Sequence, residues 1–365
     1  MNIKITKLTV KYNGRTVGHL AERKDGRIIF QYTAEWIAGG FSISPFSLPL
    51  SNQVYSNPKN TFGGLYGVFA DSLPDGWGEL LVSRMLAKKG INYDRLPALT
   101  RLTLISGNGL GALTYEPCQV EKTKDGQVDL DKIAVEAARV LDDSENSDDF
   151  DFDAVYRLGG SSGGARPKAH IKDGGEFWIV KFPCSNDPEN IGQQEYTANA
   201  LARDCGIEVN EFKLFPSKLC AGYFGAKRFD IDGNKKRVHT VSLSSLLETT
   251  HRIPNLDYMH FFQVIQQISA RQGDLIEAFR RMCFNVAFGN RDDHGKNFSF
   301  IYDEKIKGYR LSPAYDTTST PHKGEHEMTV NGSGIPTEAD LLEVAKSFKL
   351  SAEKCAEIIA TIKER

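Results

Sequence analysis

The sequence predicts an α+β fold in which a β-rich beginning is followed by a mainly helical end. The first 50 residues contain short runs that alternate apolar and polar side chains, which is the pattern of half-buried strands. Beyond residue 240, the segments DYMHFFQVIQQISA and DLIEAFRRMCFNVAFGN are amphipathic to strongly apolar, which favours helices. Strand and helix patterns follow one another between these ends, so we expect both kinds of element there.

The composition is that of an ordinary globular protein, since 40% of the 365 residues are hydrophobic and 25% are charged. A chain of this length can form two or three lobes with separate cores. The net charge of −2 provides no broad basic surface for binding nucleic acid, although a local basic patch remains compatible with it.

The sequence carries no pattern typical of a membrane or secreted protein. No apolar run approaches the roughly 20 residues of a membrane span. The first residues, MNIKITKLTV, alternate like a strand and lack the apolar core of a signal peptide. The six cysteines are scattered without a CxxC pair, which favours reduced thiols over disulfides or zinc. We therefore expect a cytoplasmic protein with no membrane partner.

Turn and capping residues divide the first third of the chain into elements. Asn13 and Gly14 separate two alternating runs, which is a strong hairpin signal, and RIIFQY can supply a third strand. The segment FADSLPDGWGELLVSRMLAKKG predicts a loop followed by a helix that Gly90 closes. A glycine-rich segment, LISGNGLGALTYEP, comes next.

An acidic stretch at residues 142–153, DDSENSDDFDFD, predicts a solvated loop and the main domain boundary. The expected division is a region of residues 1–118, with a small β-rich subdomain of about residues 1–50, a lobe of residues 150–235 and a mainly helical lobe of residues 236–365.

After this boundary the elements become regular. EFWIVKFP predicts a strand that ends in Lys181. IGQQEYTANALARDCGI then predicts a helix that Gly206 closes, and YFGAKRFDI predicts a strand around Phe229. Further on, FSFIYD and GYRLSP predict a short hairpin. The segments EADLLEVAKSF and AEKCAEIIATIK predict two closing helices.

The segment GNRDDHGKNFSF contains the pattern D-x-x-x-x-N, formed by Asp292 and Asn297. In phosphoryl transfer, an Asp in this pattern accepts the proton of the attacking hydroxyl, and the Asn binds a magnesium ion. A second metal ligand should follow a short hairpin, and Asp316 stands there in AYDTTS. Magnesium prefers such oxygen ligands, so the sequence predicts Mg²⁺-dependent phosphoryl transfer.

Other interpretations of this segment stay open. Asp293 would give D-x-x-x-N, the wrong register, so we assign the base to Asp292. The pair of aspartates could also form a polar turn that caps the preceding helix. A hydrolytic metal site is weakened because the remaining histidines show no paired ligand spacing.

A second glycine-rich segment, GGSSGGARPK at residues 159–168, is a candidate clamp for phosphates. Glycines let backbone N–H groups approach phosphate oxygens, and serine and arginine add donors. The segment does not match the P-loop pattern, and a flexible linker is an alternative. The next strand brings Lys181, which could contact the α- and β-phosphates, and the next helix brings Glu195, which could form a supporting ion pair with it.

At these residues the sequence resembles the HipA family of serine/threonine-protein kinase toxins from bacterial toxin–antitoxin systems. The likeness covers almost the whole chain. Its motifs are FSISPFSLPL and GVFADSLPDGWGELLVSRML in the first part, and SSGGARPKA, WIVKFP, AKRFD, GNRDDHGKNFSF and LSPAYD in the second.

The resemblance implies a kinase core with a two-lobed, phosphatidylinositol-kinase-like fold, an N-terminal β-rich subdomain and a mainly helical C-terminal lobe. It implies that Asp292 is catalytic and that Asn297 and Asp316 bind Mg²⁺. The family autophosphorylates a serine of its glycine-rich loop, which is Ser161 or Ser162 here. The residues implied to contact ATP are Ser162, Gly163, Gly164, Ala165, Arg166, Pro167, Lys168, Lys181, Lys227, Arg228, Phe229, His294, Lys296 and Tyr315.

The resemblance also implies partners. Family members phosphorylate translation components such as aminoacyl-tRNA synthetases. A small helix-turn-helix antitoxin, HipB-like, restrains them, and DNA is reached only through that antitoxin. Two other functions stay open: a small-molecule kinase, because related enzymes share the catalytic logic, and a catalytically weak corepressor that binds the antitoxin.

Overall fold

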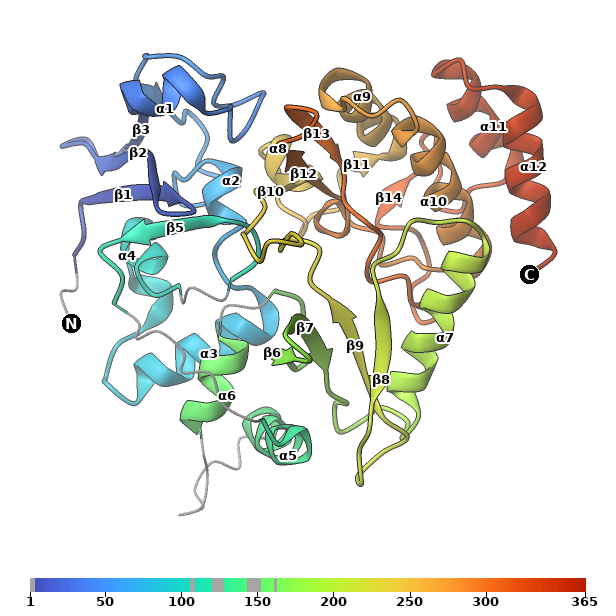
Figure 1. Cartoon of the computed structure of the whole chain (residues 1–365), viewed down its shortest axis with the longest axis horizontal. Coiled ribbons are helices and arrows are strands. Elements are labelled where there is room, and N and C mark those ends of the chain that lie inside the picture. The colour runs from blue at the N-terminus through green and yellow to red at the C-terminus, as the bar shows by residue number, and fades with distance from the viewer. Residues whose placement is uncertain (1–3, 106–108, 120–127, 143–151, 161–162) are drawn as a thin grey trace. The chain divides into compact units, whose positions relative to one another are not determined.

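The structure is a computed structural model, and its chain forms two compact units (Figure 1). Unit 1 contains Met1–Gln193 and Lys213–His239, and unit 2 contains Gln194–Phe212 and Thr240–Arg365. Both units mix helices and strands. The described residues are 4–105, 109–119, 128–142, 152–160 and 163–365.

The first sheet of unit 1 is antiparallel, with the strand order β4-β3-β2-β1-β5. Its strands are β1 (Lys7–Tyr12), β2 (Arg15–Glu22), β3 (Ile28–Tyr32), β4 (Tyr55–Ser56) and β5 (Leu113–Glu116). Asn13 and Gly14 both have positive φ, at 46° and 84°, as a tight hairpin turn requires. The predicted hairpin is therefore confirmed, and the side chains of Leu8, Val10 and Tyr12 alternate into the core.

The second sheet of unit 1 has the order β6-β7-β9-β8. Its strands are β6 (Lys168–Asp173), β7 (Glu176–Lys181), β8 (Phe212–Phe215) and β9 (Tyr223–Lys227). Trp178, Val180 and Phe182 pack with Tyr223 in its core. The strand expected around Phe229 ends earlier, at Lys227, because the chain turns where Arg228 pairs with Asp230.

The helices of unit 1 pack beside these sheets. They are α1 (Ala34–Gly39), α2 (Gly67–Ala70), α3 (Gly76–Ala87), η1 (Tyr93–Arg95), α4 (Ala98–Leu102), α5 (Leu130–Leu141) and α6 (Phe152–Gly159). The helix predicted before Gly90 is α3. The acidic stretch was expected to be a loop up to residue 153. Its residues 143–151 lie outside the described residues, and α6 begins at Phe152. Asp131 of α5 accepts hydrogen bonds from Ser217 and from the hydroxyl of Tyr223, which ties α5 to the sheet.

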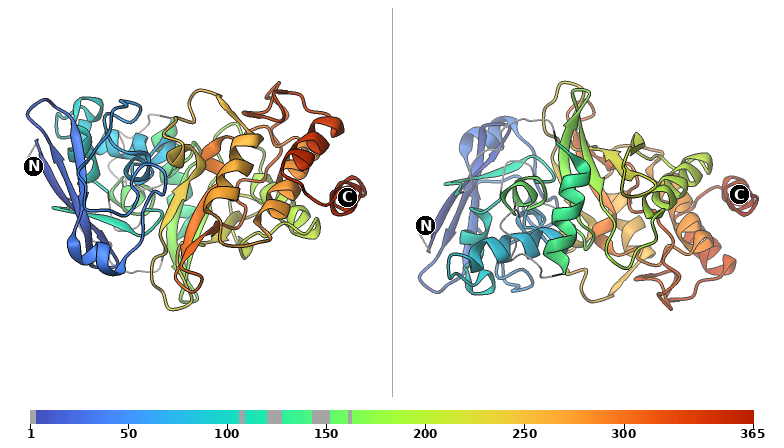
Figure 2. Two further views of the ribbon diagram at one scale, coloured as in Figure 1. Left: turned by 90° about the horizontal axis from the view of Figure 1, so that it is seen from above. Right: turned by 90° about the horizontal axis from the view of Figure 1, so that it is seen from below.

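Unit 2 is mainly helical and contains a small antiparallel sheet with the order β10-β12-β13 (Figures 1 and 2). Its strands are β10 (Thr240–Ser242), β12 (Ser299–Asp303) and β13 (Gly308–Leu311), and β11 (Leu256–Asp257) pairs with β14 (Met328–Thr329). The helices are most of α7 (Ile191–Asp204), then α8 (Leu243–Leu246), α9 (Tyr258–Ile268), α10 (Asp274–Phe288), η2 (Gly295–Asn297), α11 (Glu338–Ser347) and α12 (Ala352–Lys363). The predicted hairpin and both closing helices are confirmed. The core centres on aromatic contacts of Phe261 with Phe298 and Phe300.

None of the helices in the described residues combines the length and apolar character that crossing a bilayer requires.

A buried histidine in unit 1 makes the stability of this unit depend on pH. His239 is fully buried, and its Nε2 lies 2.8 Å from the carbonyl oxygen of Ile43. Burial lowers the pKa of His239 from 6.5 to about 4, and the hydrogen bond to Ile43 opposes this only in part. Because the lowered pKa belongs to the folded state, the stabilisation is complete above pH 6.5 and is lost as the pH falls toward 4.

We expect His239→Gln to flatten the acid dependence of stability. Glutamine keeps an N–H donor for Ile43 but does not titrate. Between pH 7 and pH 5, wild type should lose roughly 2 kcal/mol more unfolding free energy than the variant. Urea unfolding of both proteins at the two pH values measures this difference. Equal losses would show that His239 ionises freely in the folded protein.

Candidate active site

The D-x-x-x-x-N motif lies on the loop between α10 and β12 in unit 2. Gly289 ends α10 in the left-handed conformation, with φ at 69°, and donates its N–H to the carbonyl oxygen of Asn285. The chain can then turn sharply, because glycine adopts positive φ without a steric penalty. Asn297 closes the turn by donating its Nδ2 to the backbone oxygen of Asp292 at 2.7 Å. The spacing of the motif thus corresponds to one hydrogen-bonded loop.

The carboxylate of Asp292 is accessible, with 43% of the side chain exposed. It forms an ion pair with Lys323, whose ammonium group also lies 2.7 Å from the carboxylate of Glu327. Burial lowers the pKa of Lys323, but the hydrogen bonds to Asp292 and Glu327 outweigh this effect and raise it. Lys323 is therefore a cation at neutral pH, held against the candidate base.

Asp293 has the opposite environment, because its side chain is fully buried. Its carboxylate accepts hydrogen bonds from the hydroxyl of Tyr258 at 2.9 Å and from the backbone N–H of Glu327 at 3.0 Å. Nδ1 of His326 lies 2.8 Å from the same carboxylate. A carboxylate with this many partners is fixed in the interior, so Asp293 ties the loop to β14 and α9.

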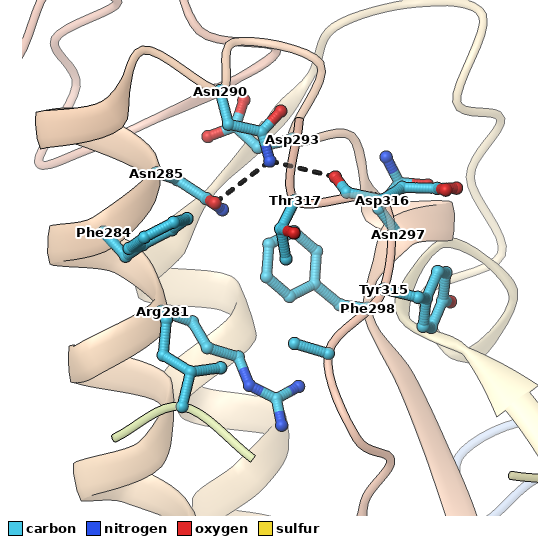
Figure 3. A pocket seen from close by; sticks show the side chains of 12 residues that line it. Arg281, Phe284, Asn285, Asn290, Asp293, Asn297, Phe298, Tyr315, Asp316 and Thr317 are labelled. Carbon is cyan, nitrogen blue, oxygen red and sulfur yellow. Dashed lines mark hydrogen bonds between the residues drawn. The ribbon is translucent and has the colours of Figure 1, made fainter. Parts of the chain in front are cut away.

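Asn297 and Asp316 line one pocket, although 19 positions separate them in the sequence (316 − 297) (Figure 3). Asn290, Asp293 and Thr317 also line it, and the cavity volume is about 20 Å³. Asp316 has a positive φ of 53°. Its backbone oxygen accepts a hydrogen bond from Nδ2 of Asn290 at 3.1 Å. The structure thus brings the two expected metal ligands together, whereas Asp292 is not among the lining residues.

The two ligands fit a magnesium ion by their chemistry. Nδ2 of Asn297 is engaged by Asp292, which leaves the amide oxygen of Asn297 as a possible ligand. Asp316 adds a carboxylate, and Mg²⁺ usually takes one or two carboxylates and completes its shell with water and substrate phosphates. Within the described part of the chain, no group of three or more His, Cys, Asp or Glu side chains is placed to hold a metal ion.

Two further expected residues, His294 and Lys296, belong to the same loop, and a third, Tyr315, contacts it. Tyr315 donates its hydroxyl to the backbone oxygen of Lys296 at 2.7 Å, and this hydroxyl also lies 2.7 Å from Oγ of Ser299. The ring of His294 lies 5.2 Å from the ring of His251. Tyr315 therefore links the segment that contains Asp316 to the loop that contains Asn297.

The two members of the expected supporting ion pair belong to different units. Lys181 ends β7 in unit 1, with its ammonium group 5.8 Å from the ring of Phe224. Glu195 lies in α7 of unit 2 and is buried. Their pairing stays a prediction.

The glycine-rich loop of unit 1 packs against the start of α3. The N–H of Gly164 donates to the carboxylate of Asp75, and the N–H of Trp77 donates to the oxygen of Gly164 at 2.9 Å. A Cβ at Gly76 would lie 2.5 Å from that oxygen, so only glycine permits this approach. Lys168 donates its ammonium group to the oxygen of Gly163. The motif SLPDGWGELL therefore supports the loop, a role that the sequence alone did not indicate.

Two further residues of the loop, Arg166 and Pro167, are also fixed by contacts within unit 1. Arg166, next to Ala165, forms an ion pair with Asp187, and the oxygen of Pro167 accepts the N–H of Phe182 at 2.8 Å. Ser161 and Ser162 lie outside the described residues.

In the segment Lys227 to Phe229, the side chains of Lys227 and Arg228 pair with acidic residues of unit 1. Lys227 forms an ion pair with Glu176 at 3.3 Å. Arg228 is buried and donates to Asp230, and its own backbone N–H donates to the oxygen of Phe177 at 2.8 Å. Burial raises the pKa of Asp230, but the charge of Arg228 outweighs this and keeps it below its usual range. The side chain of Arg228 therefore has a structural role here.

Family models match both parts of the chain. The HipA-like C-terminal domain matches residues 160–365, and the HipA N-terminal domain matches residues 8–116. The chain is 28% identical over 357 residues to the protein named "Putative kinase Y4dM" from Sinorhizobium fredii, a match that covers 90% of this chain and 81% of the relative. It is 26% identical over 211 residues to the protein named "Toxin YjjJ" from Escherichia coli, covering 53% of this chain and 46% of the relative.

A solved structure has a similar fold. A chain of the complex of HipA, HipB and operator DNA from Shewanella oneidensis MR-1 superimposes with a TM-score of 0.73 and 18% identity, covering 98% of this chain and 88% of that chain. At this identity the likeness shows the mixed α/β fold. Because the C-terminal family model alone spans more than half of the residues, this chain belongs to the HipA family.

Proposed function

We propose that the protein is an ATP- and Mg²⁺-dependent serine/threonine-protein kinase that acts as the toxin of a toxin–antitoxin module. The observation that carries this proposal is the pocket of unit 2, in which Asn297 and Asp316 lie together beside the loop of Asp292. The names of the relatives, a kinase and a toxin, agree with it.

In the proposed reaction, Asp292 accepts the proton of the attacking serine or threonine hydroxyl. Its exposed carboxylate can be reached by a protein substrate. Asn297 and Asp316 hold Mg²⁺, which neutralises the charge on the ATP phosphates when it is bound. Lys323 forms an ion pair with the Asp292 carboxylate and limits its rotation.

The residues proposed to contact ATP are those that the resemblance to the HipA family implies. In unit 1 they are the loop from Ser162 to Lys168, the ammonium group of Lys181 and the segment Lys227 to Phe229. In unit 2 they are His294 and Lys296, which belong to the catalytic loop, and Tyr315, which contacts it. We propose that residues 150–235 and 236–365 form the two lobes of a phosphatidylinositol-kinase-like core, and that residues 1–118 form the N-terminal region.

We also propose that the kinase autophosphorylates Ser161 or Ser162. Phosphoserine carries about −1.5 to −2 charges at neutral pH. This charge would repel the ATP phosphates from the loop, so the modification should weaken ATP binding.

The proposed partners are a HipB-like helix-turn-helix antitoxin and a protein substrate of the translation machinery, such as an aminoacyl-tRNA synthetase. The solved relative from Shewanella is bound to HipB and operator DNA, which supports an antitoxin partner here. DNA would be reached only through that antitoxin.

Expression without an antitoxin should arrest bacterial growth in wild type but not in Asp292→Ala. Growth curves after induction measure the arrest, and phosphoproteomics soon after induction identifies the modified protein. A phosphorylated serine or threonine that appears only in wild type supports the kinase. Normal growth with soluble protein that still transfers phosphate would contradict the toxin role, and a modified metabolite without any phosphoprotein would favour a small-molecule kinase.

A further inference from the structure

Two buried oxygen atoms beside the proposed metal ligands have no hydrogen-bond partner among the described residues. They are Oδ1 of Asn290 and Oγ1 of Thr317. Both residues line the pocket that Asn297 and Asp316 also line (Figure 3), and only 3% and 4% of their surfaces are exposed. Burying a polar atom without a partner destabilises a protein. Such atoms therefore point to a bound group inside the pocket.

A directional chain of hydrogen bonds determines which atom of Asn290 remains available. The hydroxyl of Tyr258 donates to the carboxylate of Asp293 at 2.9 Å, so the oxygen of Tyr258 can accept from Nδ2 of Asn285, also at 2.9 Å. The amide oxygen of Asn285 then accepts from Nδ2 of Asn290 at 3.0 Å.

The same Nδ2 of Asn290 also donates to the backbone oxygen of Asp316 at 3.1 Å. Both of its partners are acceptors, as the dashed lines in Figure 3 show. The Asn290 amide therefore cannot be flipped without breaking both bonds. Its Oδ1 is a fixed acceptor that lacks a donor within the described part of the chain.

A water molecule bound to a divalent cation has the complementary chemistry. Mg²⁺ loses its water ligands reluctantly and usually keeps several of them. Such a water gives its lone pair to the metal, so it can only donate hydrogen bonds and needs acceptors. Oδ1 of Asn290 and Oγ1 of Thr317 can both accept. The cavity of about 20 Å³ has room for a water, which needs roughly 10–15 Å³.

We propose that Asn290 and Thr317 are positioning residues that hold a water of the cation bound by Asn297 and Asp316. The inference rests on the proposed function, since it assumes that this pocket takes Mg²⁺ with a nucleotide. It adds two residues to the site: Thr317, which follows Asp316, and Asn290, which lies two positions before Asp292. Partners of this kind orient metal-bound groups, and their loss typically weakens metal binding.

Thr317→Val gives the sharper test, because valine matches threonine in shape and lacks only the hydroxyl. That hydroxyl has no partner among the described residues, so its removal should leave the melting temperature of the metal-free protein unchanged or slightly higher. Metal binding should weaken at the same time. Asn290→Leu is the second variant, but it also removes the two hydrogen bonds that Nδ2 donates.

Calorimetry of the full-length protein with ADP provides a readout that does not depend on activity. Each protein is titrated with ADP once in excess Mn²⁺ and once in a chelator. The Kd in the chelator divided by the Kd in Mn²⁺ measures how much the metal tightens ADP binding. We expect this ratio to fall about 10-fold in Thr317→Val, with the metal-free Kd unchanged, and to recover in Thr317→Ser. The control is Thr361→Val on α12, whose exposed hydroxyl donates to the backbone oxygen of Glu357.

The outcomes separate this inference from the proposed function. If Asp316→Asn abolishes the coupling while Thr317→Val and Asn290→Leu keep the wild-type ratio, the inference is overturned and the metal site stands. If Mn²⁺ does not tighten ADP binding even in wild type, both are overturned. A loss in Thr317→Val that Thr317→Ser restores supports the inference.

Discussion

Asp292→Ala is expected to slow phosphate transfer roughly 10²–10⁴-fold, the usual cost of removing a general base. The protein should remain folded. The side chain of Asp292 is 43% exposed, and its ion pair with Lys323 lies near the surface. Ion pairs of this kind contribute about 0–1 kcal/mol to the free energy of unfolding. Loss of activity with little loss of stability is therefore the signature that we predict.

Asp293→Ala, at the neighbouring position, provides a matched comparison, because here we expect a large loss of stability. Asp293 is fully buried, and its removal leaves the hydroxyl of Tyr258 and the backbone N–H of Glu327 without their acceptor. Breaking a buried charged network of this kind costs about 3–5 kcal/mol of unfolding free energy. Asp293→Ala should therefore melt well below wild type.

Two measurements on the purified variants separate these roles: the initial rate of transfer from labelled ATP and the midpoint of urea unfolding. Asp292→Asn should behave like Asp292→Ala, because it keeps the shape but cannot accept the proton. The assignment would be wrong if Asp293→Ala were folded but inactive while Asp292→Ala kept full activity. The base would then be Asp293, in the register D-x-x-x-N.

Asp316→Asn should remove most of the magnesium dependence of nucleotide binding. Asparagine tolerates the positive φ of 53° at this position better than most residues do, so the change mainly removes the negative charge. Loss of an inner ligand should weaken metal binding by more than the roughly 10–100-fold that loss of an outer partner costs. Asn297→Ala should act in the same direction, although it also removes the hydrogen bond to Asp292.

Titration of Mg²⁺ at a fixed ATP concentration measures this requirement in each variant. Asp303→Asn on β12 is a suitable control, because Asp303 forms an ion pair with Arg310 away from the pocket. An unchanged magnesium requirement in both Asp316→Asn and Asn297→Ala would remove the metal assignment, even if the protein proved to be a kinase.

Local signals in the sequence predicted much of the fold. The Asn13-Gly14 pair determines a hairpin turn through its own backbone preferences, and Gly206 follows α7 with a φ of 81°. The candidate site followed from spacing, because Asp292 and Asn297 share one short loop whose closing hydrogen bond needs that separation. Asp316 could be predicted because the short β12–β13 hairpin brings the chain back toward the loop of Asp292 and Asn297.

The other parts of the site depend on contacts that no local pattern encodes. Lys323 meets Asp292 across 31 positions, and Asp75 meets Gly164 across 89 positions. Nothing in the residues around Lys323 distinguishes it from a solvated lysine. The sequence also did not reveal that Arg228 is buried against Asp230, since burial of a charge depends on the surrounding sheet.

We propose that this chain transfers phosphate from ATP to a serine or threonine with Asp292 as the base. The most direct measurement is to incubate purified wild type and Asp292→Ala with γ-labelled ATP and Mg²⁺ and to map the label by mass spectrometry. We expect label on a serine or threonine of the wild-type protein, at Ser161 or Ser162 first, and none on Asp292→Ala. Equal labelling of both proteins, or no labelling of a wild-type protein that binds ATP and Mg²⁺, would contradict it.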